Sequence, residues 1–403
     1  MILYFIGLTE SYEGEGYDRK NLKIPQNQEE LLAEIAETVG KDHIAAISFG
    51  GAPMDFSFEK NVGAILHMYL GGQAVGESVA DLISGEVNPS GKLAETIPFS
   101  EKDTPAWRYF APPNDDVEYR ESIFVGYRYY ETFHVPVKYP FGYGLSYTSF
   151  SYSELNVPEV YSGGKIQIRF KIKNIGKVSG AEIAQLYVCP NESDVIRSHI
   201  ELKGFQKIYL HPREEKEVIL ELDERSFSVY DVEKKAFSML SGKYQICIGA
   251  SVHDLQLKAN MEVVGNSYFR NERELFPDYF REQPHGMEIS AEQFYQLLGG
   301  EPKHDKEKKR GEYTVYDSYQ DVVNVSMFGK FVRGVVHIGL KIILRGKSER
   351  DPAFKMVKMG VEEGNLEGLI ATSGGIATPK LIDMLVYNAN KKYLQAFKRL
   401  LKK

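Results

Sequence analysis

MILYFIGLTESYEGEGYDRK (residues 1–20) opens with an apolar run and then becomes polar and rich in glycine. The run MILYFIGL is typical of a strand buried on both faces in a parallel sheet. Four charged residues follow in the polar part: Glu13, Glu15, Asp18 and Arg19. Because the first residue already lies within such a strand, we expect the chain to be a fragment of a longer protein.

Strands and helices alternate over the first hundred residues. The pattern predicts a helix over 27–39, strands over 43–51 and 62–70, and a helix over 73–84. Strands that are separated by helices are joined by crossover connections, which indicates a mostly parallel sheet. Ligands on such sheets bind beyond the carboxyl ends of the strands, and the loop that contains Glu15 follows one of these ends.

The chain changes character after residue 100. Residues 101–150 concentrate Pro, Tyr and Gly, and we interpret them as a long connection with aromatic packing. From 151 to 264 short segments alternate between apolar and polar residues, which predicts an antiparallel β-sandwich. The expected fold class is therefore α/β plus all-β, with domains at 1–150, 151–264 and 265–403.

Residues 265–403 combine a charged linker with helices. The run EPKHDKEKKRGE (301–312) is typical of a solvated linker, and Asp351 and Thr378, each followed by Pro, predict two helix starts. The segment 332–347 could lie in a membrane interface, although its β-branched residues and glycines favour a packed core. The tail has an excess of basic residues and the rest of the chain an excess of acidic ones, so we expect the tail to dock on its own chain.

Composition limits the classes of function. A net charge of -7 argues against nucleic-acid binding, and no apolar run approaches the ~20 residues that span a bilayer. Only Cys189 and Cys247 are present, which argues against a disulfide framework or a zinc cluster and favours a reducing compartment. The first residues lack the basic segment of a signal peptide, so we expect a cytoplasmic protein. We also expect neither a metal nor an organic cofactor.

Carboxylates in the loop after the first strand are the candidates for catalysis. Glycoside cleavage needs a carboxyl group that donates a proton to the leaving oxygen and later takes one from water. Glu13 and Glu15 lie two residues apart, so in an extended loop they point to opposite sides and only one can face a given site. The glycines at 14 and 16 let Glu15 project, whereas Glu13 is more simply a solvated or supporting group.

Four further residues are candidates for supporting roles. Asp18 and Arg19 most simply bind each other or backbone groups of the loop, and Arg19 could also keep a nearby carboxylate ionised. Trp107 and Tyr109 lie on a loop, where they could line a substrate cleft. The alternative for both aromatic residues is packing.

Five segments together carry a resemblance to a known family. They are EGEGYDRKNLKIPQNQ, GGQAVGESVADLISGEVNPSGKLAETIP, YRESIFVGYRYYET, YPFGYGLSYTSF and LSGKYQICIGAS. In this order they are similar to the C-terminal part of glycoside hydrolase family 3, the β-glucosidase type. The resemblance covers about residues 1–264 and implies the C-terminal part of an (α/β)6 sandwich domain over 1–150 and a fibronectin type III-like domain over 151–264. The helical extension is not part of the family's common core.

The resemblance implies a retaining β-glycosidase that hydrolyses terminal non-reducing β-D-glucosyl or similar residues. In that family a (β/α)8 barrel supplies an aspartate nucleophile, and the (α/β)6 domain supplies the acid/base glutamate, which matches Glu15. The resemblance begins within the (α/β)6 domain, so we expect the barrel to be absent from residues 1–403, and no SDW phrase occurs among them. We therefore expect the N-terminal barrel portion to be a partner and residues 1–403 alone to be inactive. The alternative is a non-catalytic module that binds carbohydrate or protein.

Overall fold

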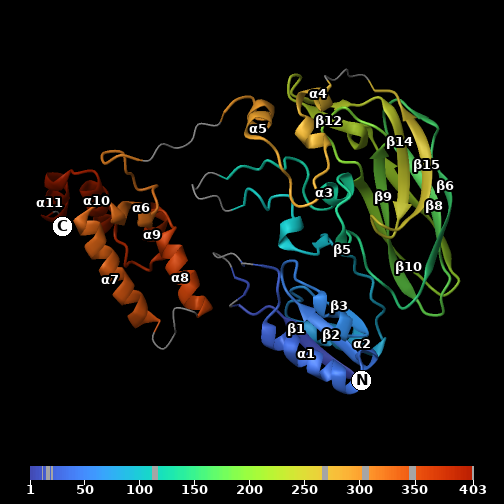
Figure 1. The fold of residues 1–403 in the computed structure, drawn as a ribbon, viewed down its shortest axis with the longest axis horizontal. Helices are drawn as coiled ribbons and strands as arrows, with labels where there is room; N and C mark the ends of the chain where they lie inside the picture. Colours follow the sequence, from blue (N-terminus) through green and yellow to red (C-terminus); the bar gives the residue numbers. More distant parts are fainter. Residues whose placement is uncertain are drawn as a thin grey trace. The chain divides into compact units, whose positions relative to one another are not determined.

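The computed structural model describes residues 1–10, 12–14, 19, 21–110, 117–265, 271–301, 308–344 and 351–401. It confirms the predicted fold class, because an α/β part is followed by a β-sandwich and then by helices (Figure 1). The chain forms two compact units, of which the first contains Met1–Leu3, Glu29–Ala46 and Ala52–Pro302 and the second contains Tyr4–Gln28, Ile47–Gly51 and Lys303–Lys403. No helix among the described residues is long and apolar enough to cross a membrane.

The α/β part contains three strands and two helices, with the bounds β1 Ile2–Gly7, α1 Gln26–Val39, β2 Ile44–Phe49, β3 Ala64–His67 and α2 Val75–Ser84. The strands form one sheet in the order β1-β2-β3. The central strand, IAAISF, is buried along nearly all its length, as expected for a strand covered on both faces. α1 buries Leu32, and α2 ends at Gly85, whose left-handed conformation favours glycine after a helix.

The connection after the α/β part contains only short elements, with the bounds β4 Ile97–Pro98, α3 Tyr127–Thr132 and β5 Val137–Tyr139. Several of its aromatic residues are packed, as the sequence predicts, while others such as Phe110 and Tyr119 are exposed. The packed ones share a core with residues from a segment more than a hundred positions later, and the buried members are Phe124, Tyr129, Tyr130, Val135, Phe276, Tyr279, Met287 and Ile289. The Tyr129 hydroxyl donates a hydrogen bond to the Gln283 carbonyl at 2.6 Å.

Three short helices accompany this later segment, with the bounds α4 Glu272–Leu275, η5 Pro277–Phe280 and α5 Ala291–Leu298. Phe276 and Tyr279 are buried where α4 passes into η5. Residues 271–290 therefore complete the core of the connection. The domain boundaries at 150 and 264 stay predictions.

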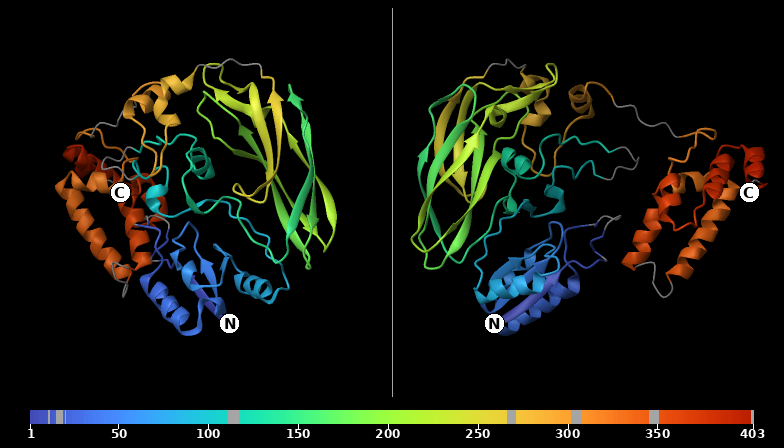
Figure 2. Two further views of the ribbon diagram at one scale, coloured as in Figure 1. Left: turned by 45° about the vertical axis from the view of Figure 1, so that its right-hand side comes forward. Right: turned by 180° about the vertical axis from the view of Figure 1, so that it is seen from behind.

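The β-sandwich consists of a five-stranded sheet, in the order β10-β9-β14-β15-β7, and a three-stranded sheet, in the order β11-β8-β6. Its strands have the bounds β6 Phe150–Asn156, β7 Val160–Tyr161, β8 Ile166–Asn174, β9 Gly180–Pro190, β10 Glu201–Leu210, β11 Glu215–Leu222, β14 Gly242–Gly249 and β15 Leu255–Val263. Figure 2 shows the two sheets stacked face to face. Along β8 every second residue points into the core between the sheets, as Ile168, Phe170 and Ile172 do. A small hairpin is formed by β12 Ser228–Asp231 and β13 Ala236–Met239.

The second unit contains six helices among its described residues, with the bounds α6 Tyr319–Asn324, α7 Met327–Ile343, α8 Pro352–Glu362, α9 Leu366–Thr372, α10 Pro379–Ala389 and α11 Tyr393–Leu401. The helix starts predicted at Asp351 and Thr378 are confirmed, because each side chain accepts a hydrogen bond from the first turn of its helix. α7 covers most of segment 332–347, for which the sequence predicted either a packed core or a membrane interface. One face of α7 is packed, since Val332 is buried and Phe328 and Val336 contact the same core.

Candidate functional site

The loop after β1 is held at the point where it leaves the sheet. Gly7 donates its N–H to Oε1 of Gln28 at 2.9 Å and accepts a bond from Nε2 of the same side chain at 3.1 Å. Leu8 then donates its N–H to the Phe49 carbonyl at 3.1 Å. A Cβ at position 7 would lie 2.4 Å from that carbonyl oxygen, so only glycine fits here. One side chain at the start of α1 thus ties the end of β1 to the end of the loop.

Glu13 links this loop to the loop that follows β2. Both of its carboxylate oxygens accept the N–H of Gly51, at 2.8 and 2.9 Å, and its own N–H donates to the Thr9 carbonyl at 3.0 Å. The side chain is half-buried. Glu13 is one of the two carboxylates that the sequence offers for acid/base chemistry, and the structure uses it to hold two loops together at the edge of the sheet.

The other residues predicted in this loop are only partly described. Glu15 and Asp18 lie outside the described residues, so the predicted acid/base and the predicted Asp18–Arg19 contact stay predictions. Arg19 is half-buried. The structure therefore defines the two ends of the loop and the Glu13 contact, and the sequence alone places Glu15 between them.

Trp107 and Tyr109 lie in the connection, and the structure gives them different surroundings. The Tyr109 hydroxyl donates to the Ile289 carbonyl and accepts the Ile289 N–H, both at 2.9 Å, and the Arg120 guanidinium lies 4.5 Å from the centre of its ring. Tyr109 thus links the connection to residues 271–290 through hydrogen bonds. The Trp107 side chain is exposed. The prediction that these two residues line a substrate cleft stays a prediction.

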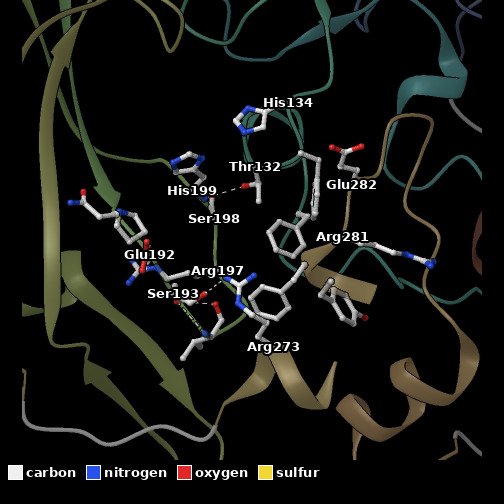
Figure 3. Close-up of a pocket in the computed structure, with 17 residues that line it drawn as sticks. Thr132, His134, Glu192, Ser193, Arg197, Ser198, His199, Arg273, Arg281 and Glu282 are labelled. Carbon is white, nitrogen blue, oxygen red and sulfur yellow. Dashed lines mark hydrogen bonds between the residues drawn. The ribbon is translucent and has the colours of Figure 1, made fainter. Parts of the chain in front are cut away.

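A cavity of about 340 Å³ lies beside the loop that follows β9 (Figure 3). Three separate segments line it, within 124–134, 190–199 and 273–282. Arg197 is buried and donates to the Tyr244 hydroxyl at 2.9 Å, while Arg273 lies over the ring of Phe280. Sequence analysis proposed none of the lining residues as part of a site, because they come from three segments that no single motif spans.

Both signs of charge are present around this cavity. Arg197 and Arg273 are accompanied by Glu192 and Glu282, and Arg273 forms an ion pair with Asp194 at 3.1 Å. Burial, and to a lesser extent the charge of a neighbouring histidine, lowers the pKa of His199, so its ring is neutral at neutral pH. Among the described residues no group of three or more His, Cys, Asp or Glu could hold a metal ion. The cavity has no feature that assigns it a step in glycoside cleavage.

The α/β sheet with its acidic loop, joined to a β-sandwich, is the arrangement that the resemblance to a multidomain glycoside hydrolase implies. Comparison with known families specifies which one. Residues 1–147 match the glycosyl hydrolase family 3 C-terminal domain, and residues 182–252 match the fibronectin type III-like domain. The chain therefore contains the C-terminal domain of glycoside hydrolase family 3 and a fibronectin type III-like domain, which confirms the resemblance noted from the sequence.

Several characterised relatives share this part. The thermostable beta-glucosidase B of Acetivibrio thermocellus is 44% identical over 261 residues, which are 64% of this chain and 34% of that protein. An exo-alpha-(1->6)-L-arabinopyranosidase of Bifidobacterium breve is 36% identical over 66% of this chain and 35% of its own length. The crystal structure of a beta-glucosidase of this family from Bifidobacterium adolescentis has a TM-score of 0.63 at 37% identity and covers 66% of this chain and 39% of its own. The chain thus spans about a third of the length of the curated relatives it matches.

Proposed function

We propose that residues 1–264 supply the general acid/base, Glu15, to a retaining β-glycosidase. The observation that carries the proposal is the bond from Gly51 to both carboxylate oxygens of Glu13. A carboxylate that holds two loops together is poorly suited to exchange protons with a substrate. Of the two glutamates in the segment EGEG, Glu15 is therefore the one left for proton transfer. The family match over residues 1–147, which includes this loop, supports the same assignment.

In the proposed reaction Glu15 acts twice. A carboxylate nucleophile from the barrel portion attacks the anomeric carbon, while the Glu15 carboxyl donates its proton to the departing glycosidic oxygen. The Glu15 carboxylate then takes a proton from water as that water attacks the anomeric carbon and releases the nucleophile. Two displacements restore the original configuration, and retaining enzymes hold the two carboxyl groups about 5–5.5 Å apart.

The proposed substrate is a terminal, non-reducing β-D-glucosyl residue or a similar sugar. The names of the relatives support this, since most of those compared are beta-glucosidases. The arabinopyranosidase relative shows that other pyranosides are accepted within the same range of identity. An N-terminal barrel portion is the proposed partner, and we expect the reaction to take place in the cytoplasm.

Residues 1–403 alone are expected to have no useful hydrolytic activity, because the nucleophile of the proposed reaction lies on that partner. Acid catalysis by Glu15 without a nucleophile cannot form the glycosyl-enzyme intermediate. The second candidate function is a module that binds carbohydrate or protein without catalysis. The relatives favour the enzyme, since the portion of them that this chain matches belongs to hydrolases.

A chimeric enzyme tests the proposal. In beta-glucosidase B of Acetivibrio thermocellus, the matching 261 residues are replaced by the corresponding residues of this chain. The chimera is expected to hydrolyse an aryl β-glucoside with a poorly activated phenol, and a Glu15→Ala variant is expected to do so about 10²–10⁴ times more slowly. A folded chimera that binds the glucoside without cleaving it would favour the binding module. Turnover by residues 1–403 alone would show that the nucleophile lies within this chain.

A further inference from the structure

α7, with 17 residues, is the longest helix in the described part of the second unit (Figure 1), and one of its faces packs in a core. The packed face bears Phe328, Val332 and Val336, which join a core with α6, α9 and α10. Outside this face several side chains are exposed, while Arg333 donates a hydrogen bond to Oδ1 of Asn324 at 2.8 Å. This exposed surface divides into two stripes of different chemistry.

The first stripe is apolar. Its members are between 54% and 90% exposed, and they are Met327, Phe331, Val335, Ile338 and Ile342. At about 100° per residue these positions fall within an arc of about 80°, directly beside the packed face. Single exposed apolar residues are ordinary on a protein surface, but five in a row along one helix mark an interaction surface.

The second stripe is basic. Lys330, Arg333, His337 and Lys341 fall within another arc of about 80°, on the other side of the apolar stripe from the core. No Asp or Glu occurs in Met327–Ile343. On the neighbouring helix α8, Lys358 and Glu362 lie close to this stripe. Among the described residues that line the cavity at this point, Lys330, Arg333 and Lys358 outnumber Glu362, so this part of the stripe keeps an excess of positive charge.

α11 repeats this composition within the same unit. Its exposed apolar residues Leu394, Phe397 and Leu401 follow a spacing of three and four, which places them on one face. Lys398 lies beside them, and Arg399 forms an ion pair with Asp383 at 2.7 Å. The second unit thus has two helices with exposed apolar residues and basic neighbours.

We propose that the second unit binds the surface of an anionic lipid bilayer, with α7 lying in the plane of the interface. A helix that buries one apolar stripe among the acyl chains and keeps Lys and Arg at its side matches a surface of negatively charged headgroups. The sequence allowed either a packed core or a membrane interface for segment 332–347. In its helical part, which ends at Ile343, the proposal combines the two, because one face of the helix packs in a core and another faces the lipid. The proposal does not depend on the proposed glycosidase function.

Charge disfavours a second copy of the chain as the occupant. Two α7 helices that paired through their apolar stripes would bring two stripes with an excess of positive charge together, which is repulsive. The acidic remainder of the chain, on which sequence analysis expected the tail to dock, is the other competitor. To dock on α7, the acidic remainder of the chain would need an apolar surface that covers the five residues of the apolar stripe, as well as acidic residues opposite the basic stripe.

Sedimentation with vesicles tests the proposal, using residues 1–403 and two lipid mixtures. One mixture is phosphatidylcholine alone, and the other contains 30% phosphatidylglycerol, about the level at which a surface attracts basic helices. The chain is expected to bind the anionic vesicles at least about tenfold more tightly than the neutral ones. At 0.5 M salt most of this preference should disappear, because the charges are screened.

Matched variants separate the two stripes from general effects. Phe331→Ser removes an apolar side chain that is 68% exposed, and Phe205→Ser removes one of 66% exposure on β10. Only the first is expected to weaken vesicle binding, by about tenfold. Lys330→Glu should weaken it about 30-fold, since the attraction of one basic residue corresponds to about fivefold in affinity. Lys207→Glu, on the exposed side of β10, should have no effect.

Two further measurements identify the competing occupants. Equal binding to neutral and anionic vesicles, or no response to Phe331→Ser, overturns the proposal. Light scattering that shows a dimer in wild type and a monomer in Phe331→Ser, without vesicle binding, assigns the surface to a second copy. A lower melting temperature in Phe331→Ser than in Phe205→Ser, again without vesicle binding, assigns it to the chain itself.

Discussion

Replacement of Glu13 by Gln tests how the proposed catalytic loop is held. The carboxylate accepts one N–H, that of Gly51, through both oxygens at 2.8 and 2.9 Å. Glutamine keeps the length of the side chain but removes its charge and replaces one acceptor by an NH2 group, which faces the same N–H. If Glu13 holds the loop through Gly51, the loop of the Glu13→Gln variant should spend less time in its native position. If Glu13 is the acid/base, the variant should instead lose proton transfer to the leaving group.

The size of the effect follows from this contact. A hydrogen bond to a charged group contributes about 1.5–3 kcal/mol and one between neutral groups about 0.5–1.5 kcal/mol. The side chain is half-buried and solvent competes for it, so we expect a loss of about 1 kcal/mol. One kcal/mol corresponds to about fivefold in a rate or population. Because displacement of a catalytic group by ~1 Å can cost about 100-fold, kcat/KM should fall by about five- to 100-fold.

Aryl β-glucosides with phenols of increasing acidity provide the assay, in the chimeric enzyme. In Glu13→Gln the rate should fall by the same factor for every phenol, since proton donation is intact. The matched control is Glu77→Gln, which alters an exposed glutamate of α2 in the same domain. The control should leave the rates unchanged.

Two results would refute this reasoning. A steep dependence on the acidity of the phenol in Glu13→Gln, without one in Glu15→Ala, would reverse the roles of the two glutamates. Unchanged rates and unchanged melting in Glu13→Gln would show that the contact with Gly51 does not hold the loop.

The other predictions concern proton transfer, packing and pH. Glu15→Ala should slow hydrolysis of poorly activated glucosides by about 10²–10⁴ and spare the most acidic phenols, and equal losses for all phenols would contradict a role in proton donation. Phe276→Ala should cost about 3–5 kcal/mol in denaturant unfolding because Phe276 is fully buried, whereas the exposed Phe205→Ala should cost little; similar values for the two would contradict the shared core. Burial raises the pKa of Glu121 above its ordinary value of 4.5, so its native state loses stability as the pH rises through that raised pKa. Glu121→Gln should therefore gain stability relative to wild type between pH 4 and 7, and a constant difference across this range would argue against the shift.

Much of the fold could be predicted from neighbouring residues. The alternation in β8 and the apolar run of β2 are visible in the sequence, as are the two helix starts at Asp351 and Thr378. These features depend on residues within one or two turns of each other, so a local pattern contains the information. The five segments that resemble the family are local patterns as well, since each is a short stretch of the chain.

The contacts that position the candidate site depend on residues far apart in the chain. Glu13 and Gly51 are 38 positions apart, and Tyr129 and Gln283 are 154 apart. From the sequence, both Glu13 and Glu15 are candidates for acid/base catalysis. Only the folded chain brings the Gly51 N–H to Glu13. The same holds for α7, whose apolar residues look alike in the sequence and are divided by packing into a buried and an exposed face. Such contacts arise when distant segments close on each other and their shapes and polar groups match, which no local window of residues records.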